Sequence, residues 1–163
     1  MDEPASPELV TGAADFAARA TQMVGTARME IALLTFDLDR RAYGGAAFTD
    51  ALRRFVLQHA HTKVRILVNA TQAAMANNPR LIEFGRSLTS FVEFRELLPP
   101  RQLVVRQELL IADGHTMLFK ESSSDLEAKY YPAQPLEVRA KLKEFQVFWD
   151  ESVPAQELRR LGA

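Results

Sequence analysis

The feature that most constrains this chain is an Asp-Gly pair between two β-forming runs. Asp113-Gly114 separates residues 102–112 from residues 116–120, and both runs are rich in apolar side chains. Asp and Gly tolerate the positive φ angles that tight hairpin turns require. The pattern therefore predicts a β-hairpin over residues 102–120.

Helical and extended patterns alternate on both sides of this hairpin. Apolar residues recur at helical spacing over 12–26, after Gly44-Gly45, after Pro79 and over 135–150, whereas 30–36, 64–68 and 91–97 have the pattern of strands. The run 30–36 is almost continuously apolar, as expected of a central strand that is covered on both faces. This order indicates one α/β domain with a mostly parallel central sheet and helices on the sheet faces.

The length and composition of the chain are those of a single domain. The 163 residues, 47% of them hydrophobic, can bury one ordinary core. We expect residues 1–10 to form a flexible leader, residues 11–152 the α/β domain, and residues 153–163 a tail helix that follows Pro154.

Charge and residue usage exclude several classes of site. The net charge is −1 and basic residues alternate with acidic ones between positions 80 and 108, so nucleic acid is not expected as a partner. The absence of cysteine excludes disulfides and thiolate zinc sites, and it fits a reducing cytoplasm. Neither a signal-like start nor an apolar run of ~18 residues is present, so we expect a cytoplasmic, bacterial-type domain without membrane contact.

The first run of the hairpin carries charged residues at a distinctive spacing. It reads Arg106-x-Glu108-x-x-x-x-Asp113-Gly114. This pattern resembles the signature of the phospholipase D superfamily, His-x-Lys-x-x-x-x-Asp-Gly, which runs along a buried strand into a tight turn. The Asp-Gly pair is kept, whereas Arg106 stands at the His position and Glu108 at the Lys position. The order of elements over residues 12–152 is similar to one half of that fold, including a late aromatic helix.

The resemblance implies a phosphodiesterase fold that has lost its chemistry. In active members the His attacks phosphorus, the Lys neutralises the phosphoryl oxygens, and two motifs meet from tandem halves or from a dimer. Arg106 is always protonated and cannot attack phosphorus, and Glu108 would repel the phosphate. We therefore expect no catalytic residue, no cofactor and no metal, and a binding or scaffolding role with a homodimer or an unknown protein as partner.

Two interpretations of the altered motif stay open. Residues two apart on a strand share one face, so Arg106 and Glu108 would form an ion pair, within the chain or reciprocally across a dimer. Alternatively, Arg106 would bind an anion without turnover, together with Lys120 and with Ser123, which stands near the position of a family Asn. Asp113 is explained by the turn alone.

A few other residues suggest chemistry and have simpler explanations. Asp37-x-Asp39 after an apolar strand resembles the haloacid dehalogenase motif, but its further residues cannot be placed. His59 and His61 are two positions apart at the end of a predicted helix, so their side chains point in different directions and do not suggest a metal site. His115 lies nine positions beyond the expected nucleophile. The alternative hypothesis is a divergent phosphodiesterase or nuclease with an unrecognised nucleophile, and His115 is the nearest candidate for that nucleophile.

Overall fold

The computed structural model describes residues 7–132 and 135–159. The strands are β1 (Glu8–Thr11), β2 (Glu30–Thr35), β3 (Lys63–Val68), β4 (Val92–Glu96), β5 (Glu108–Ala112), β6 (Thr116–Lys120), β7 (Glu127–Tyr131) and β8 (Val153–Pro154). The helices are α1 (Ala13–Thr26), α2 (Arg40–Tyr43), α3 (Ala46–Gln58), α4 (Thr71–Asn77), α5 (Pro79–Ser87), α6 (Arg101–Val104), α7 (Pro135–Glu151) and α8 (Gln156–Arg159). No helix among these residues combines the length and the apolar composition needed to cross a membrane.

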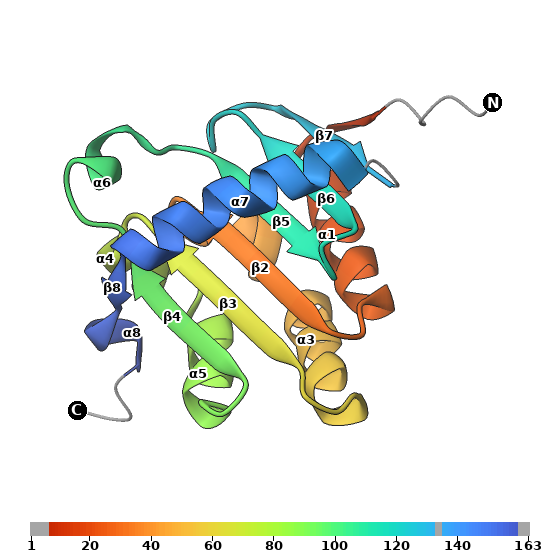
Figure 1. Ribbon diagram of the computed structural model, residues 1–163. Coiled ribbons are helices and arrows are strands. Elements are labelled where there is room, and N and C mark those ends of the chain that lie inside the picture. Colours follow the sequence, from red (N-terminus) through yellow and green to blue (C-terminus); the bar gives the residue numbers. More distant parts are fainter. Residues whose placement is uncertain (1–6, 133–134, 160–163) are drawn as a thin grey trace.

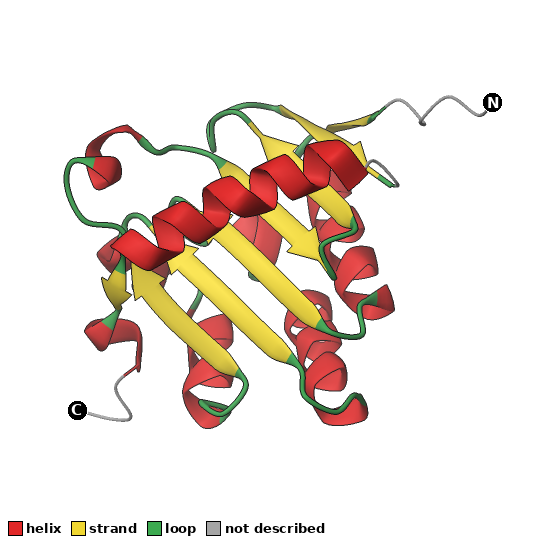
Figure 2. Ribbon diagram, in the orientation of Figure 1, coloured by secondary structure: helices red, strands yellow, loops and turns green. Residues whose placement is uncertain are grey.

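The strands form one sheet that separates two layers of helices. Figure 1 shows α7 running across one face, while α1, α3 and α5 lie on the other face; the strands between them are seen clearly in Figure 2. The strand order is β1-β7-β6-β5-β2-β3-β4-β8. The predicted α/β domain with helices on both sheet faces is confirmed.

Fewer neighbouring strands of the sheet are parallel than the sequence predicted. Only the pairs β2–β3 and β3–β4 are parallel, and the other neighbouring strands run antiparallel. The parallel pairs are those joined by crossover segments that contain α3 and α5. From β5 to β7 the connections are short, and a short connection can only join antiparallel neighbours.

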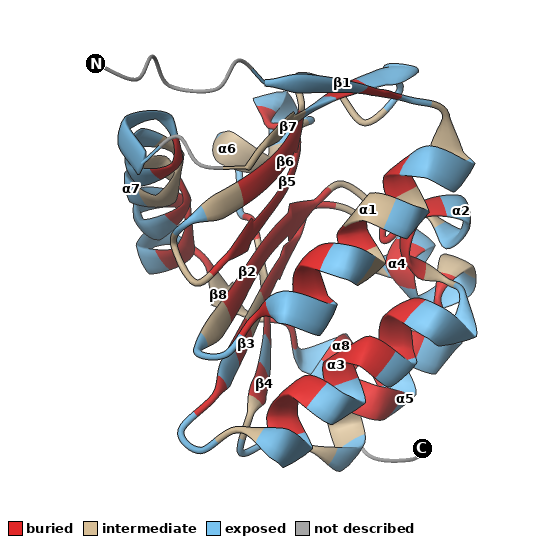
Figure 3. Cartoon of the chain, turned by 90° about the vertical axis from the view of Figure 1, so that its right-hand side faces the viewer, coloured by how far each residue is buried: buried red, intermediate tan, exposed pale blue. Residues whose placement is uncertain are grey.

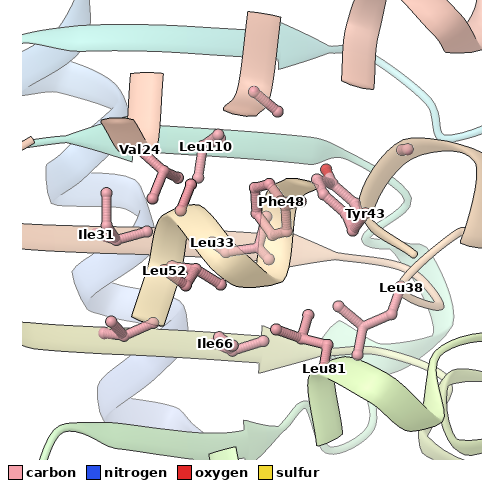
Figure 4. Close-up of a cluster of buried hydrophobic side chains, with 14 of the residues drawn as sticks. Val24, Ile31, Leu33, Leu38, Tyr43, Phe48, Leu52, Ile66, Leu81 and Leu110 are labelled. Atoms are coloured by element: carbon pink, nitrogen blue, oxygen red, sulfur yellow. The ribbon is translucent and has the colours of Figure 1, made fainter. Parts of the chain in front are cut away.

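The central strand β2 is buried on both faces, as its composition predicted. Ile31 and Leu33 belong to the larger core under α1 and α3, shown in Figure 4, whereas Ala32 and Leu34 belong to the core under α7. Figure 3 shows the same division edge-on, with buried residues on the strands and on the inward sides of the helices. β5 has the same two-sided burial, so the motif strand lies in the interior of the sheet.

Both ends of the described chain add strands to the sheet edges. β1 begins within the segment that was expected to be a leader; it pairs with β7 and buries Val10. β8 pairs with β4, and α8 follows within the segment where a tail helix was expected. The rest of the expected leader, residues 1–6, and residues 160–163 of the tail lie outside the described residues.

The predicted hairpin is present, but its first strand is shorter than expected. β5 and β6 pair antiparallel from Glu108↔Lys120 to Ala112↔Thr116. Residues 102–104 belong to the short helix α6 instead of a strand, and Leu103 and Val104 are largely exposed. Apolar composition was therefore misleading here, because these side chains have no neighbouring strand or helix to cover them.

Asp113 fastens the hairpin to the start of β2. Asp113 and Gly114 have φ angles of 57° and 64°, the left-handed values predicted for this pair. The Asp113 carboxylate accepts hydrogen bonds from the backbone N–H groups of Arg28 (2.9 Å), Met29 (2.8 Å) and Glu30 (3.0 Å). The Asp113 N–H donates to the Glu30 carbonyl oxygen at 2.8 Å. Asp113 is thus more than a turn residue, since it joins two elements that are far apart in the sequence.

We predict that Asp113→Asn lowers the free energy of unfolding by about 2 kcal/mol. Asn tolerates the left-handed backbone, but it has one acceptor oxygen where the carboxylate has two, and hydrogen bonds to a charged group are each worth roughly 1.5–3 kcal/mol. Urea unfolding measures the change. Asp125→Asn is the matched control, because the Asp125 carboxylate accepts, among the described residues, only from the Ser122 N–H. Equal losses in both variants would contradict the role given to Asp113.

Candidate functional site

The motif residues lie where β2 ends and β5 begins. β2 and β5 are antiparallel, with Leu34 opposite Leu109, so Thr35 and Phe36 pass beside Glu108. On the other side of β5, Glu108 stands opposite Lys120 at the end of β6. One end of three adjacent strands therefore brings together the positions that the resemblance singled out.

The Glu108 side chain is enclosed within the protein. Only 3% of Glu108 is exposed. Its Oε2 accepts a hydrogen bond from the Phe36 N–H at 2.8 Å, and its Oε1 accepts one from the Tyr43 hydroxyl at 2.9 Å. The alternation along β5 turns Glu108 to the same face as Leu110 and Ala112, the face covered by α1 and α3.

Burial makes Glu108 a weak acid. Removal from water raises the pKa of its carboxyl from 4.5 to about 7, and the negative charge of Asp37 adds to this increase. Hydrogen bonds from Phe36, Thr35 and Tyr43 favour the charged form and limit the rise in pKa. Near neutral pH this carboxyl therefore exists in both protonation states.

Tyr43 is the functional group at this site that sequence reasoning missed. Its ring lies fully buried at the end of α2, between Phe16 (5.7 Å between ring centroids) and Phe48 (5.4 Å), as Figure 4 shows for Phe48. Burial and the neighbouring Glu108 charge raise the pKa of the Tyr43 hydroxyl well above 10, so it stays protonated and donates. Nothing in the sequence around Tyr43 signals a partner that lies 65 positions away.

Arg106 does not pair with Glu108 of the same chain, so the predicted ion pair within the chain is wrong. The Arg106 guanidinium donates to the carbonyl oxygens of Gln102 (3.1 Å) and Val105 (3.2 Å), and it lies over the Phe36 ring at 4.9 Å. Within the described part of the chain no salt bridge joins it to a carboxylate. The prediction failed because β5 begins only at Glu108, so the alternation of a strand does not extend back to Arg106.

The structure places the other two residues of the predicted anion site near the same strand end. The Ser123 N–H donates to the Arg106 carbonyl oxygen at 2.7 Å, so these two backbones are in contact. The Lys120 ammonium lies over the Phe16 ring at 4.9 Å, on the face of the sheet to which Glu108 points. Anion binding by Arg106, Lys120 and Ser123 stays a prediction.

The aspartates that follow β2 have structural partners. The Asp39 side chain accepts from the Arg41 N–H at 2.9 Å and pairs with the Arg41 guanidinium at 3.0 Å, which begins α2. Burial and the charge of Asp39 raise the pKa of Asp37, whereas hydrogen bonds from Arg41 lower the pKa of Asp39 despite partial burial. In residues 7–132 and 135–159, no three His, Cys, Asp or Glu side chains are grouped so that they could hold a metal ion.

His115 is far from the altered motif. It is exposed in the hairpin loop after Ala112, whereas Arg106 and Glu108 lie at the opposite end of β5. A strand of this length spans on the order of 15 Å. Within one chain, His115 therefore lies too far from Glu108 to stand in for the family histidine.

Solved structures with the same fold include members of the phospholipase D family. TrmBL2, described as an archaeal chromatin protein with a novel mode of DNA binding, has a TM-score of 0.65 at 16% identity, over 95% of this chain and 56% of that chain. Nuc from Salmonella typhimurium, described as a phospholipase D family member, has a TM-score of 0.63 at 13% identity, over 91% and 97% of the two chains. Phosphatidylserine synthase from Haemophilus influenzae Rd KW20 has a TM-score of 0.68 at 12% identity, over 97% and 40%.

These similarities confirm the predicted phospholipase D-like fold. This chain spans about half of the chromatin protein and less than half of the synthase, but nearly all of Nuc. A family model described as "Domain of unknown function (DUF7931)" matches residues 12–161. Among proteins of curated function, none matches this sequence.

We predict that Glu108 makes the folded state less stable as the pH rises from about 4.5 to 7. In this range the folded chain retains a proton on Glu108 that the unfolded chain has released, because burial raises the pKa from 4.5 to about 7. The contribution is complete below pH 4.5, is lost as the pH rises through 7, and amounts to roughly 3 kcal/mol.

The comparison of wild type with Glu108→Gln isolates this contribution. The glutamine amide can still accept from Phe36 and contact the Tyr43 hydroxyl, but it does not titrate. Urea unfolding at pH 5 and pH 8 should therefore show a smaller loss of stability in the variant, whereas Glu137→Gln, on the exposed side of α7, should behave as wild type. An identical pH dependence in wild type and Glu108→Gln would contradict the prediction.

Proposed function

This chain belongs to the DUF7931 family, and we propose that it is a binding or scaffolding module whose phospholipase D-like site no longer hydrolyses phosphodiesters. The observation that carries the proposal is the environment of Glu108. At the position where active members of the superfamily have a phosphate-binding lysine, this chain has a carboxyl that is 3% exposed and whose two oxygens bond to Phe36 and Tyr43.

The chemistry of phosphodiester cleavage is not supported by these residues. The reaction needs a nucleophile with a pKa near neutrality and cationic charge around the phosphoryl oxygens. Arg106 stands at the nucleophile position and is always protonated. Glu108 supplies either a neutral acid or a negative charge, and a negative charge repels a phosphate group.

The packing at the site supports a structural use of the motif strand. Tyr43 bonds to the Glu108 carboxyl and its ring packs against Phe16 and Phe48, so the Tyr43 side of the carboxyl is filled by the protein itself. A catalytic site would need this space for substrate. Hydrogen bonds from Phe36 and Tyr43 offset the cost of burying the carboxyl.

Binding of an anion at Arg106 is the alternative with structural support. The Arg106 side chain is exposed, and its guanidinium contacts only carbonyl oxygens and the Phe36 ring among the described residues. The chromatin protein of similar fold is described as binding DNA. For this chain, whose net charge is −1, we keep the expectation that nucleic acid is not the partner.

We predict that the purified protein does not hydrolyse bis-p-nitrophenyl phosphate, nucleic acid or phospholipid above the rate of a protein-free blank. The reason is the loss of both the attacking imidazole and the cationic lysine, since loss of a nucleophile lowers rates by many orders of magnitude. The release of p-nitrophenol, of nucleotides and of lipid headgroups measures the three activities.

Two variants in that assay remove side chains on which turnover by an unrecognised mechanism would depend. His115→Ala removes the exposed imidazole of the hairpin loop, and Arg106→Ala removes the side chain at the nucleophile position. Wild-type turnover that disappears in either variant would contradict the proposal and would support a divergent phosphodiesterase.

We also propose that the domain forms a homodimer through the surface around α6. Leu98, Leu103 and Val104 are exposed there by 43%, 64% and 74%, close in sequence to Arg106. Exposed apolar side chains that are grouped in this way are characteristic of interaction surfaces. A reciprocal Arg106–Glu108 pair between subunits does not form part of this proposal, because the Glu108 oxygens already bond within the chain.

We predict that Val104→Asp shifts the protein from dimer to monomer in sedimentation velocity, because an unpaired charge would be buried in the interface. Leu57→Asp, on the exposed side of α3 with 66% exposure, is the control and should not change the sedimentation coefficient. A wild-type protein that sediments as a monomer at high micromolar concentration would contradict the homodimer.

A further inference from the structure

In the part of the chain that the structure describes, the outer edge of β1 carries backbone groups without partners. β1 is the last strand of the sheet and, among the described residues, it pairs only with β7. The Gly12 N–H donates to the Leu126 carbonyl oxygen at 2.9 Å, in the same register as the pairing of Val10 with Ala128. Bonded pairs alternate in an antiparallel ladder, so Leu9 and Thr11 direct their N–H and C=O groups away from β7.

β1 also lies between two hollows of the surface. On the α7 face, a hollow of about 430 Å³ has apolar walls from Leu9, Phe119, Leu126 and Tyr131. On the α1 face, a second hollow of about 380 Å³ is bordered by Leu9, Val10 and Ala18. Figure 3 shows β1 as a largely exposed strand at the margin of the sheet. A strand added to this edge would direct its side chains alternately to the two faces that carry the hollows.

The first hollow has an acidic rim. Glu121, Asp125 and Glu127 border it, opposed by Lys129 alone. One oxygen of the Asp125 carboxylate accepts from the Ser122 N–H at 3.1 Å, and no salt bridge to Glu121 or Glu127 is present in the described part of the chain. Apolar walls below a carboxylate rim fit a lysine or arginine, whose methylene stem packs on apolar surface while its charged end reaches the carboxylates.

The second hollow lacks the acidic excess of the first. Its charged lining residues are one acid and one base, Asp15 and Arg19, and Arg19 also forms a salt bridge with Glu8 at 3.1 Å and lies over the Tyr130 ring at 4.2 Å. A basic side chain would therefore meet fewer carboxylates here than at the first hollow. The two faces of β1 thus differ in the side chains that they would accept from an added strand.

We propose that β1 binds an extended basic segment of a partner protein, which adds to the sheet as a further strand. Backbone hydrogen bonds to Leu9 and Thr11 would supply affinity, and alternate Lys or Arg side chains in the acidic hollow would supply specificity. The first hollow lies on the face of the sheet opposite to Glu108, so this inference goes beyond the proposed function and does not depend on it. A second copy of β1 or a nucleic acid would bring further negative charge to Glu121, Asp125 and Glu127.

Fluorescence anisotropy of a labelled peptide tests the proposal on the full chain. The probe Lys-Val-Lys-Val-Lys-Val should bind, and the same probe with Glu in place of each Lys should not. A probe N-methylated at alternate residues, on the edge that faces β1, should bind at least about tenfold more weakly, because strand addition needs those amide donors and N-methylation leaves the protein unchanged.

Variants of the protein give the second part of the test. Leu9→Pro removes one outward N–H without removing a bond to β7, and Glu127→Lys reverses one rim charge. Each should weaken binding by at least about tenfold, whereas Glu83→Lys on α5, at the opposite face, should not alter it. Equal binding of the acidic probe, insensitivity to N-methylation, or unchanged binding by Glu127→Lys would overturn the proposal. A change from dimer to monomer in Leu9→Pro would also overturn it, because the edge would then belong to a second copy.

Discussion

The bond between the Glu108 carboxyl and the Tyr43 hydroxyl is the interaction on which this site depends. It joins the first residue of the motif strand to a helix that begins 68 positions earlier in the chain, and both groups are enclosed by apolar side chains. A buried carboxyl without partners would cost several kcal/mol. Here the Phe36 N–H and the Tyr43 hydroxyl provide partners, so the group can remain inside with a raised pKa.

The two ends of β5 are fixed to β2 by carboxyl groups. At one end Glu108 holds Phe36, just after β2, and at the other end Asp113 holds the backbone from Arg28 to Glu30, where β2 begins. Two positions that resemble the phospholipase D motif thus serve here as structural attachments. Asp113 and Glu108, which stand at the Asp and Lys positions of that motif, both help to hold one central strand in place.

Sequence patterns predicted the parts of the structure that depend on local chemistry. Asp113-Gly114 indicated the hairpin because the preference for positive φ is a property of those residues, and the apolar run 30–36 indicated β2 because burial on both faces requires it. The Arg106–Glu108 pair within the chain was predicted wrongly, since it depended on where β5 begins. Tyr43 could not be found at all, because its partner is set by the tertiary fold and not by spacing along the chain.

A titration of the Glu108 carboxyl carbon by NMR tests most directly whether the site around Glu108 is closed. The signal is assigned by its absence in Glu108→Gln. An enclosed carboxyl that bonds only within the protein should titrate with a pKa near 7, as its burial requires. A titration midpoint near the ordinary value of 4.5 would place the carboxyl in contact with water. That result would contradict a closed site. It would indicate that Glu108 lies at the surface, where a ligand could contact it.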